Sequence, residues 1–95
     1  MQNYLISMKK FENLKVGDKI LKLFSLKKEL EGFHNFSVVT TVTKIEPDPN
    51  DNTITNVWCK LEDNTYMEFD LFPSDMNKNL IYDDNDSWLE VYEIL

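Results

Sequence analysis

The sequence predicts a single, mainly β domain with a minor α component, a small barrel of about five antiparallel strands with a short C-terminal helix. Three observations predict this fold. Residues 36–46 are rich in β-branched side chains, which pack well in strands and are disfavoured in helices. Apolar and polar residues alternate strictly over 66–72, as in a half-buried strand. Clusters of Asn, Asp and Pro separate the apolar segments and are typical of turns.

The composition bounds the class of protein. The 95 residues are 42% apolar and 13% aromatic, which is enough for one globular domain over 1–95 and too little for two. The single Cys59 cannot form an internal disulfide, and Cys59 with the single His34 falls short of the ligands that a zinc site needs. The longest apolar runs are far shorter than the roughly 20 residues of a membrane span. We therefore expect a cytoplasmic protein without metal, cofactor or membrane contact.

The charge is unevenly distributed. Seventeen acidic residues and ten lysines give a net charge of −7, and the chain contains no arginine. Residues 1–45 hold eight lysines and four acids, whereas residues 46–95 hold two lysines and thirteen acids. Arginine is the side chain that best recognises phosphate and guanine, so its absence disfavours sequence-specific DNA binding. The acidic half predicts either a solvated surface or a face that docks on a basic partner.

The first third of the chain predicts one strand between irregular segments. Residues 1–10 read as an N-terminal arm or an extra edge strand. A turn at Gly17-Asp18 precedes a strand over 19–24. Residues 25–33 read as one or two helical turns that begin at Ser25, or as a loop.

The middle of the chain predicts a strand followed by two hairpins. In the strand over 36–46, the apolar phase changes between Val42 and Ile45, which predicts a bulge. Residues 47–52, with two prolines, predict a turn, and 53–61 form the hairpin partner.

The strand over 66–72 then pairs with 53–61. Its alternation places Met67, Phe69 and Leu71 on the inner face, and Val57, Cys59 and Leu61 share that face on the preceding strand. We expect these six side chains to be buried together. The predicted register sets Leu61 opposite Met67, Cys59 opposite Phe69, Lys60 opposite Glu68 and Trp58 opposite Asp70, with residues 63–65 in the loop.

The C-terminal segment predicts a short strand over 79–82, a turn over 83–86 and a helix. Trp88, Val91, Tyr92 and Leu95 follow helical spacing, and Ser87 with Glu90 matches a capping box. Such a helix closes the barrel as a lid or joins a second copy, so the chain is a monomer or a homodimer. Read as a strand, the same segment places Trp88, Tyr92 and Ile94 on one face, interrupted by Glu90.

One pattern resembles a known class of fold. The run FENLKVGDKI over 11–20, followed by VTKIE over 42–46 and a hairpin, resembles the small SH3-like β-barrel proteins of bacterial phages and mobile elements. The resemblance covers residues 11–72. It implies a barrel fold and a short closing helix, and it assigns no functional residue.

Residues that carry enzyme chemistry are scarce. His34 is the only side chain that titrates near neutral pH, and Cys59 reads as a small buried hydrophobe. Gly17 and Gly32 are isolated, so no phosphate-binding loop is present. Residues 48–52 and 83–86 resemble the start of a calcium loop but lack the glycine and glutamate of an EF-hand. We expect no enzymatic activity.

The leading hypothesis is a non-enzymatic protein-binding module. Its acidic half acts as a phosphate mimic toward a partner with a basic surface, as in a phage-encoded, host-directed inhibitor of the anti-CRISPR or other anti-defence type, located in the bacterial host cell. The candidate partner-binding residues are Trp58, Tyr66, Glu68, Asp70, Asp83, Asp84, Asp86 and Trp88.

Two alternatives remain. One is a structural or accessory phage component. The other is a nucleic-acid binder that uses Phe11 or Phe24 to stack bases, although the net charge makes nucleic acid an unfavourable partner. The lysines of that alternative are Lys9, Lys10, Lys15, Lys19, Lys22, Lys27 and Lys28.

Overall fold

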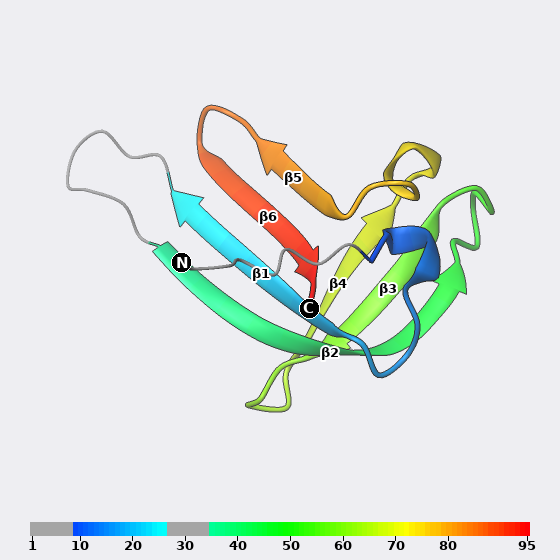
Figure 1. The fold of residues 1–95 in the computed structure, drawn as a ribbon, viewed down its shortest axis with the longest axis horizontal. Coiled ribbons are helices and arrows are strands. Elements are labelled where there is room, and N and C mark those ends of the chain that lie inside the picture. Colours follow the sequence, from blue (N-terminus) through cyan, green and yellow to red (C-terminus); the bar gives the residue numbers. More distant parts are fainter. Residues whose placement is uncertain (1–8, 27–34) are drawn as a thin grey trace, which may run out of the picture.

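The computed structural model describes residues 9–26 and 35–95, which form one sheet of six antiparallel strands curled into a half-barrel (Figure 1). The elements are the 3-10 turn η1 (Phe11–Asn13), β1 (Lys19–Leu26), β2 (Asn35–Pro47), β3 (Thr55–Lys60), β4 (Tyr66–Leu71), the 3-10 turn η2 (Pro73–Asp75), β5 (Leu80–Asp84) and β6 (Trp88–Ile94). The order across the sheet is β4-β3-β2-β1-β6-β5. The predicted mainly β fold is confirmed, with six strands in an open sheet.

Some predictions concern residues that the structure does not describe. The arm predicted over 1–10 lies outside the described residues except for Lys9 and Lys10. Of the segment 25–33, only Ser25 and Leu26 are described, and both belong to β1 rather than to a helical turn. His34 also lies outside the described residues. Within 9–26 and 35–95, no helix is both long enough and apolar enough to cross a membrane.

The turn before β1 forms as predicted. Gly17 adopts a φ of 99°, in the left-handed region that glycine enters at little cost. The Asp18 amide donates a hydrogen bond to the Lys15 carbonyl at 3.1 Å and closes the turn. The Gly17 amide donates to the Val42 carbonyl at 2.9 Å and joins the turn to β2. The turn therefore sets where β1 begins beside β2.

The change of apolar phase in β2 produces the predicted bulge. Val42 pairs with Cys59 and Lys44 pairs with Trp58, so Thr43 is the extra residue. The Thr43 hydroxyl donates to the Trp58 carbonyl at 3.3 Å. Thr43 and Lys44 are both exposed, because the bulge directs two successive side chains away from the core.

The β3–β4 hairpin has the predicted faces but a register shifted by two residues. Cys59 pairs with Met67 and Val57 pairs with Phe69, so the predicted pairs of Leu61 with Met67 and Cys59 with Phe69 are wrong. The Leu61 amide donates to the Thr65 carbonyl at 2.8 Å, so the loop is the three residues 62–64, with Asn64 at a φ of 69°. Leu61 closes the hairpin and is half-buried, so it lies outside the buried core.

The outer-face pairs change with the same shift. Trp58 lies opposite Glu68 and Lys60 lies opposite Tyr66, in place of the predicted pairs of Lys60 with Glu68 and Trp58 with Asp70. The side chains still point to the predicted faces, because a shift of two residues conserves the alternation.

The C-terminal segment is a strand, so the predicted helix is wrong. β6 pairs with β1 and also with β5, and these two ladders satisfy its backbone along its length. The Ser87–Glu90 capping box does not form. The Asn85 side chain instead accepts the Ser87 and Trp88 amides at 2.8 and 3.0 Å and closes the β5–β6 turn.

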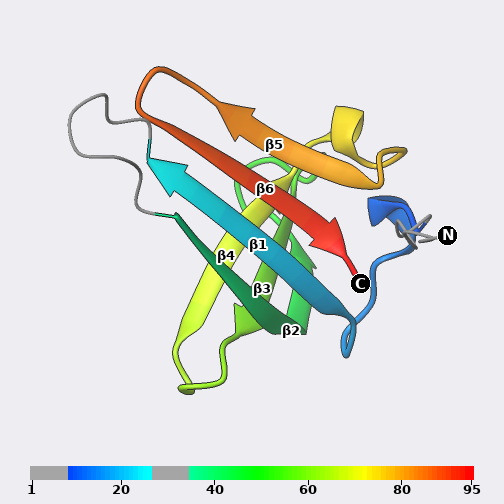
Figure 2. The ribbon, with the colours of Figure 1, turned by 60° about the vertical axis from the view of Figure 1, so that its left-hand side comes forward.

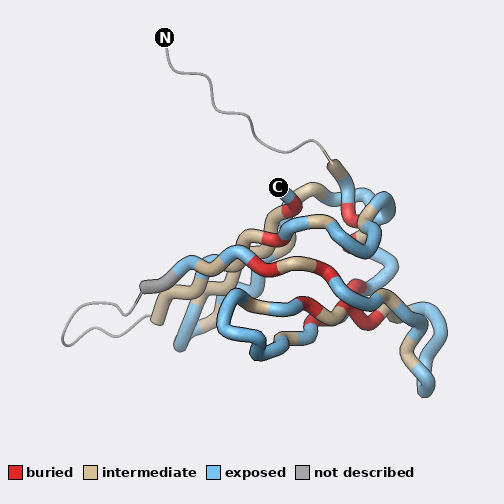
Figure 3. Tube along the Cα trace, turned by 90° about the horizontal axis from the view of Figure 1, so that it is seen from below, coloured by how far each residue is buried: buried red, intermediate tan, exposed pale blue. Residues whose placement is uncertain are grey.

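The inner face of the curled sheet holds the core. In Figure 2, β5, β6 and β1 run side by side and cross β3 and β4 steeply, and the two halves enclose the buried residues. Buried positions form short stretches within the strands, together with Phe11 of η1 and Asp75 of η2, while the hairpin loops are mostly exposed (Figure 3). The core consists of Phe11, Ile20, Val42, Val57, Cys59, Phe69, Leu71 and Ile94, with Met67 packed against it.

Candidate functional site

Four of the predicted partner-binding residues share the outer face of the β3–β4 hairpin. Trp58 lies opposite Glu68, and Tyr66 and Asp70 flank Glu68 two positions away on β4. Tyr66, Glu68 and Asp70 are exposed and Trp58 is half-buried. We call the residues Lys44, Trp58, Tyr66, Glu68 and Asp70 the Trp58 face.

Trp58 is held between charged neighbours. Lys44 pairs with Trp58 across β2 and β3, and its ammonium nitrogen lies 5.9 Å from the centroid of the indole ring, within the range of a cation–π contact. The same nitrogen lies 3.3 Å from Glu46 Oε2. These contacts orient an aromatic side chain at a solvent-facing position, where aromatic residues commonly anchor partners.

A buried amide orients the acidic end of this face. The Asn56 Nδ2 donates to Asp70 Oδ1 at 2.8 Å and to Asp48 Oδ2 at 3.3 Å. The other Asp48 oxygen accepts the amides of Asn50 and Asp51 at 2.8 and 3.2 Å. Asn56 is only 8% exposed, so one buried donor fixes two carboxylates side by side next to Trp58.

The Thr-containing turns around this face also carry oriented carboxylates. Hydrogen bonds from the Thr53 hydroxyl and amide lower the pKa of Asp51, and the same two groups of Thr65 lower the pKa of Asp63. Both carboxyls are ionised at neutral pH. The two loops that border β3 are therefore negatively charged.

The single cysteine of the chain is poorly suited to nucleophilic chemistry. Cys59 is fully buried, and burial raises the pKa of its thiol, which disfavours the nucleophilic thiolate. No group of three or more potential metal ligands occurs among the residues that the structure describes.

The other four predicted residues form a separate group at the β5–β6 turn. Asp83 and Asp84 are successive strand residues on opposite faces of β5, Asp86 is in the turn, and Trp88 begins β6. β5 is the edge strand opposite β4. The structure therefore divides the predicted residues between two surfaces at different edges of the sheet.

Two lysines of the nucleic-acid alternative lie on opposite faces of β1. Lys22 points to the inner face, where its ammonium nitrogen lies 3.2 Å from Glu90 Oε2, and Lys19 is exposed on the outer face. Phe11 is fully buried in the core and is unavailable for stacking. Lys27 and Lys28 lie outside the described residues.

Lys9 is also engaged within the fold. Its ammonium nitrogen lies 2.7 Å from Asp18 Oδ2. Partial burial opposes the ionisation of Asp18, but the hydrogen bonds from Lys9 and from the Lys15 amide outweigh it and lower the pKa of Asp18. This ion pair holds the segment before η1 to the turn before β1.

Sequence reasoning missed an apolar surface on the outer face of the other half of the sheet. Four large side chains there are 40–65% exposed, namely Leu23, Val39, Leu80 and Tyr82. The register joins them to the half-buried Leu21, Leu89 and Val91. The signal was present in β1, which carries leucines on both of its faces, whereas a strand with one solvated face alternates with polar residues. We call these seven residues the outer apolar patch.

Comparison with protein-family models, with curated proteins and with solved structures finds no match for the chain.

Proposed function

We propose that the chain is a non-enzymatic protein-binding module and that the Trp58 face contacts a basic surface of its partner. The observation that carries the proposal is the gathering of Trp58, Tyr66, Glu68 and Asp70 on one outer face that no described segment covers. A half-buried tryptophan with a polar rim is the usual arrangement of a binding hot spot.

Charge supports a basic partner. Acidic side chains surround Trp58 on β4 and in the loops on either side of β3, and Lys44 is already engaged by Glu46. Asp48 and Asp70 are held in place before binding, so little side-chain ordering opposes the encounter. Carboxylates in fixed positions can occupy a surface that otherwise binds phosphates.

This chemistry suits a phage-encoded inhibitor of a host protein, of the anti-CRISPR or other anti-defence type, and we propose that class as the biological setting. We also propose an SH3-like relationship for the fold. The meander of β1 to β4, with β6 returning beside β1, supports it.

Affinity capture from bacterial lysate tests the proposal. At about 0.1 M salt, wild-type protein should retain a partner, and about 1 M salt should release it, because the Debye length falls from about 10 to about 3 Å. Glu68→Lys should lose the partner. The matched control is Glu12→Lys, which makes the same charge change at an exposed position of η1 and should retain it. Capture of no protein at low salt, or equal capture by both variants, would contradict the proposal.

A further inference from the structure

The outer apolar patch spans four strands, and the carboxylate-bearing Glu93 of β6 lies within it between Leu80 and Leu21. Tyr82, Val91 and Leu23 pair in one row across β5, β6 and β1, and Leu21 pairs with Val39 in the next row. Side chains of one row face the same side of the sheet as their partners in the ladder. Within 9–26 and 35–95, nothing packs over this face. Contiguous exposed apolar surface of this kind marks an interaction site.

The two ends of the patch differ in charge. At one end, β5 finishes with Asp84 on this face and Asp86 follows in the turn. At the other end, Lys19, Thr41 and Lys60 form one row across β1, β2 and β3. The apolar rows lie between these charged ends. A basic partner would be repelled by the lysine end, and an acidic partner by the aspartates.

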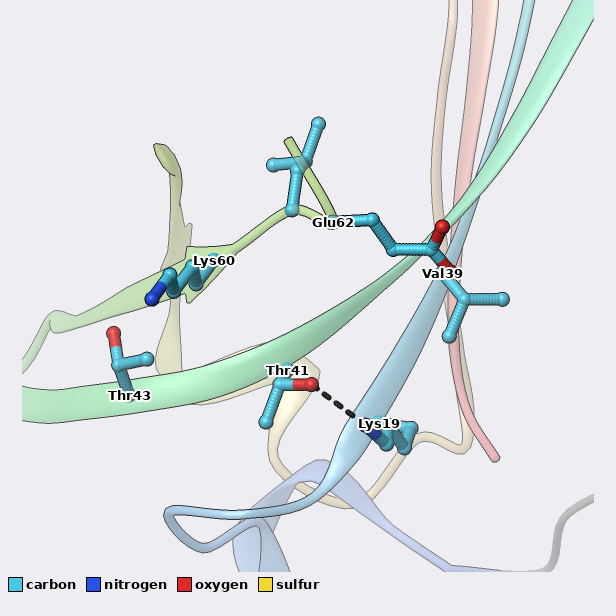
Figure 4. Close-up of a pocket in the computed structure, with 7 residues that line it drawn as sticks. Lys19, Val39, Thr41, Thr43, Lys60 and Glu62 are labelled. Carbon is cyan, nitrogen blue, oxygen red and sulfur yellow. Dashed lines mark hydrogen bonds between the residues drawn. The ribbon is translucent and has the colours of Figure 1, made fainter. Parts of the chain in front are cut away.

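The lysine end is also hollowed. A cavity of about 300 Å³ is lined by side chains that include Lys19, Val39, Thr41 and Lys60, and Figure 4 shows Lys19 donating to the Thr41 hydroxyl across it. That hydrogen bond is 2.8 Å long. Neither lysine forms an ion pair with a described residue. Glu62 also lines the hollow, which therefore offers two ammonium groups and threonine hydroxyls against one carboxylate and keeps an excess of positive charge for a partner's carboxylates.

From this surface we infer that the chain forms a two-fold homodimer through the outer apolar patch, with the β5–β6 turn of each copy seated in the lysine-lined hollow of the other. The two-fold axis lies in the plane of the interface and passes through the centre of the patch. It is perpendicular to the line between the charged ends, so it places the aspartate end of one copy against the lysine end of the other. The same rotation lays apolar rows on apolar rows. The surface is therefore complementary to itself, as the interface of a two-fold dimer requires. This favours a second copy of the chain over an unrelated protein as the occupant.

The position of the contact leaves the proposed binding surface free. Trp58, Glu68 and Asp70 lie beyond the Lys19–Thr41–Lys60 row, on the side away from the patch. The dimer therefore leaves Trp58, Glu68 and Asp70 of both copies uncovered, whereas Tyr66 pairs with Lys60 at the border of the hollow. Dimer formation can be tested independently of partner capture.

Light scattering coupled to size exclusion, over a concentration series of the full chain, tests the dimer. The wild-type mass should rise toward twice the 11.3 kDa of one chain. Leu23→Lys should remain monomeric, because it places a charge in the middle of the patch. Val16→Lys is the matched control at an exposed apolar residue in the turn before β1, and it should dimerise like wild type. Circular dichroism should show that both variants are folded.

Charge reversal supplies a test that does not depend on the patch. The double variants Lys19→Glu/Lys60→Glu and Asp84→Lys/Asp86→Lys should each be monomeric, because like charges then face each other at both ends. Mixing the two variants should restore a heterodimer, because opposite charges meet again. A wild-type monomer up to the solubility limit, a Leu23→Lys dimer, or a mixture that stays monomeric would overturn the inference.

Discussion

The ring of Tyr92 stacks on the ring of Phe69, with 4.7 Å between the centroids and 25° between the planes. Tyr92 belongs to β6 and Phe69 to β4, so this contact joins the two halves of the curled sheet across the core. Phe11 meets Phe69 edge to face at 6.4 Å. The geometry of both pairs is favourable for aromatic rings, and the half-barrel depends on Phe69 at their centre.

Removal of the Phe69 ring should strongly destabilise the fold. Phe69→Ala leaves a cavity between β4 and β6, and we expect the free energy of unfolding to fall by about 3–5 kcal/mol in urea denaturation. Tyr66→Ala, at an exposed position of the same strand, should change it by less than about 0.5 kcal/mol. A similar cost for both variants would show that the aromatic cluster does not hold the halves together.

The Tyr92 hydroxyl should make stability fall at high pH. Burial, and after it the neighbouring Glu90 carboxylate, raises the pKa of the Tyr92 phenol above its ordinary value of 10.0. The stabilisation is complete below pH 10, where both states are protonated, and is lost as the pH rises from 10 toward the folded pKa, because only the unfolded chain then ionises. Denaturation of wild type and Tyr92→Phe at pH 8 and above pH 10 checks this. Wild type should lose more stability than the variant.

Loss of the Asn56 amide should weaken the β3–β4 hairpin. Asn56→Ala removes both hydrogen bonds to Asp48 and Asp70 and should cost about 1–3 kcal/mol of unfolding free energy. Asn56→Asp places a third carboxyl beside the carboxylates of Asp48 and Asp70, and their negative charge raises the pKa of the introduced group. Its stability deficit should therefore be smallest below pH 4 and should grow toward neutral pH. A deficit independent of pH would contradict the observed geometry.

Cys59 should be unreactive until the domain unfolds. The side chain is fully buried in the core, and burial raises the pKa of the thiol. A thiol reagent at neutral pH should modify it at a rate that follows the unfolded fraction across a urea titration. Tyr66→Cys on the outer face should add a second thiol that reacts at once. Immediate modification of Cys59 in the absence of urea would contradict its burial.

Local chemistry made most strands predictable. The β-branched run of β2, the Gly17 turn and the phase change at Thr43 each depend on neighbouring residues, and all three appear in the structure. The shift of the β3–β4 register arises from Asn64, whose short side chain tolerates a positive φ. A loop of three residues that ends at Asn64 places Cys59 opposite Met67. The alternation of apolar and polar residues does not decide the register, because it is equally compatible with Cys59 opposite Phe69.

The C-terminal segment could not be assigned from its own residues. Trp88, Val91 and Tyr92 fit helical spacing, and the strand pattern contains Glu90 on the inner face. The structure resolves the conflict with contacts from distant segments, because Lys22 lies 3.2 Å from Glu90 and the Tyr92 hydroxyl donates to Glu90 at 3.3 Å. The predicted partner-binding residues fall on two separate surfaces for a similar reason. Only the order of strands in the sheet, which depends on contacts between distant segments, shows that β4 and β5 lie at different edges.

β6, the sixth strand of this sheet in chain order, lies inside the sheet beside β1. At about 5–20 residues per second, β6 follows β1 from the ribosome by roughly 3–14 s. During that interval the β6-facing edge of β1 has no partner, and β1 carries leucines on both faces. An unpaired apolar edge readily pairs with another chain. The nascent polypeptide is therefore prone to aggregation until β6 has been synthesised, and slower synthesis lengthens that exposure.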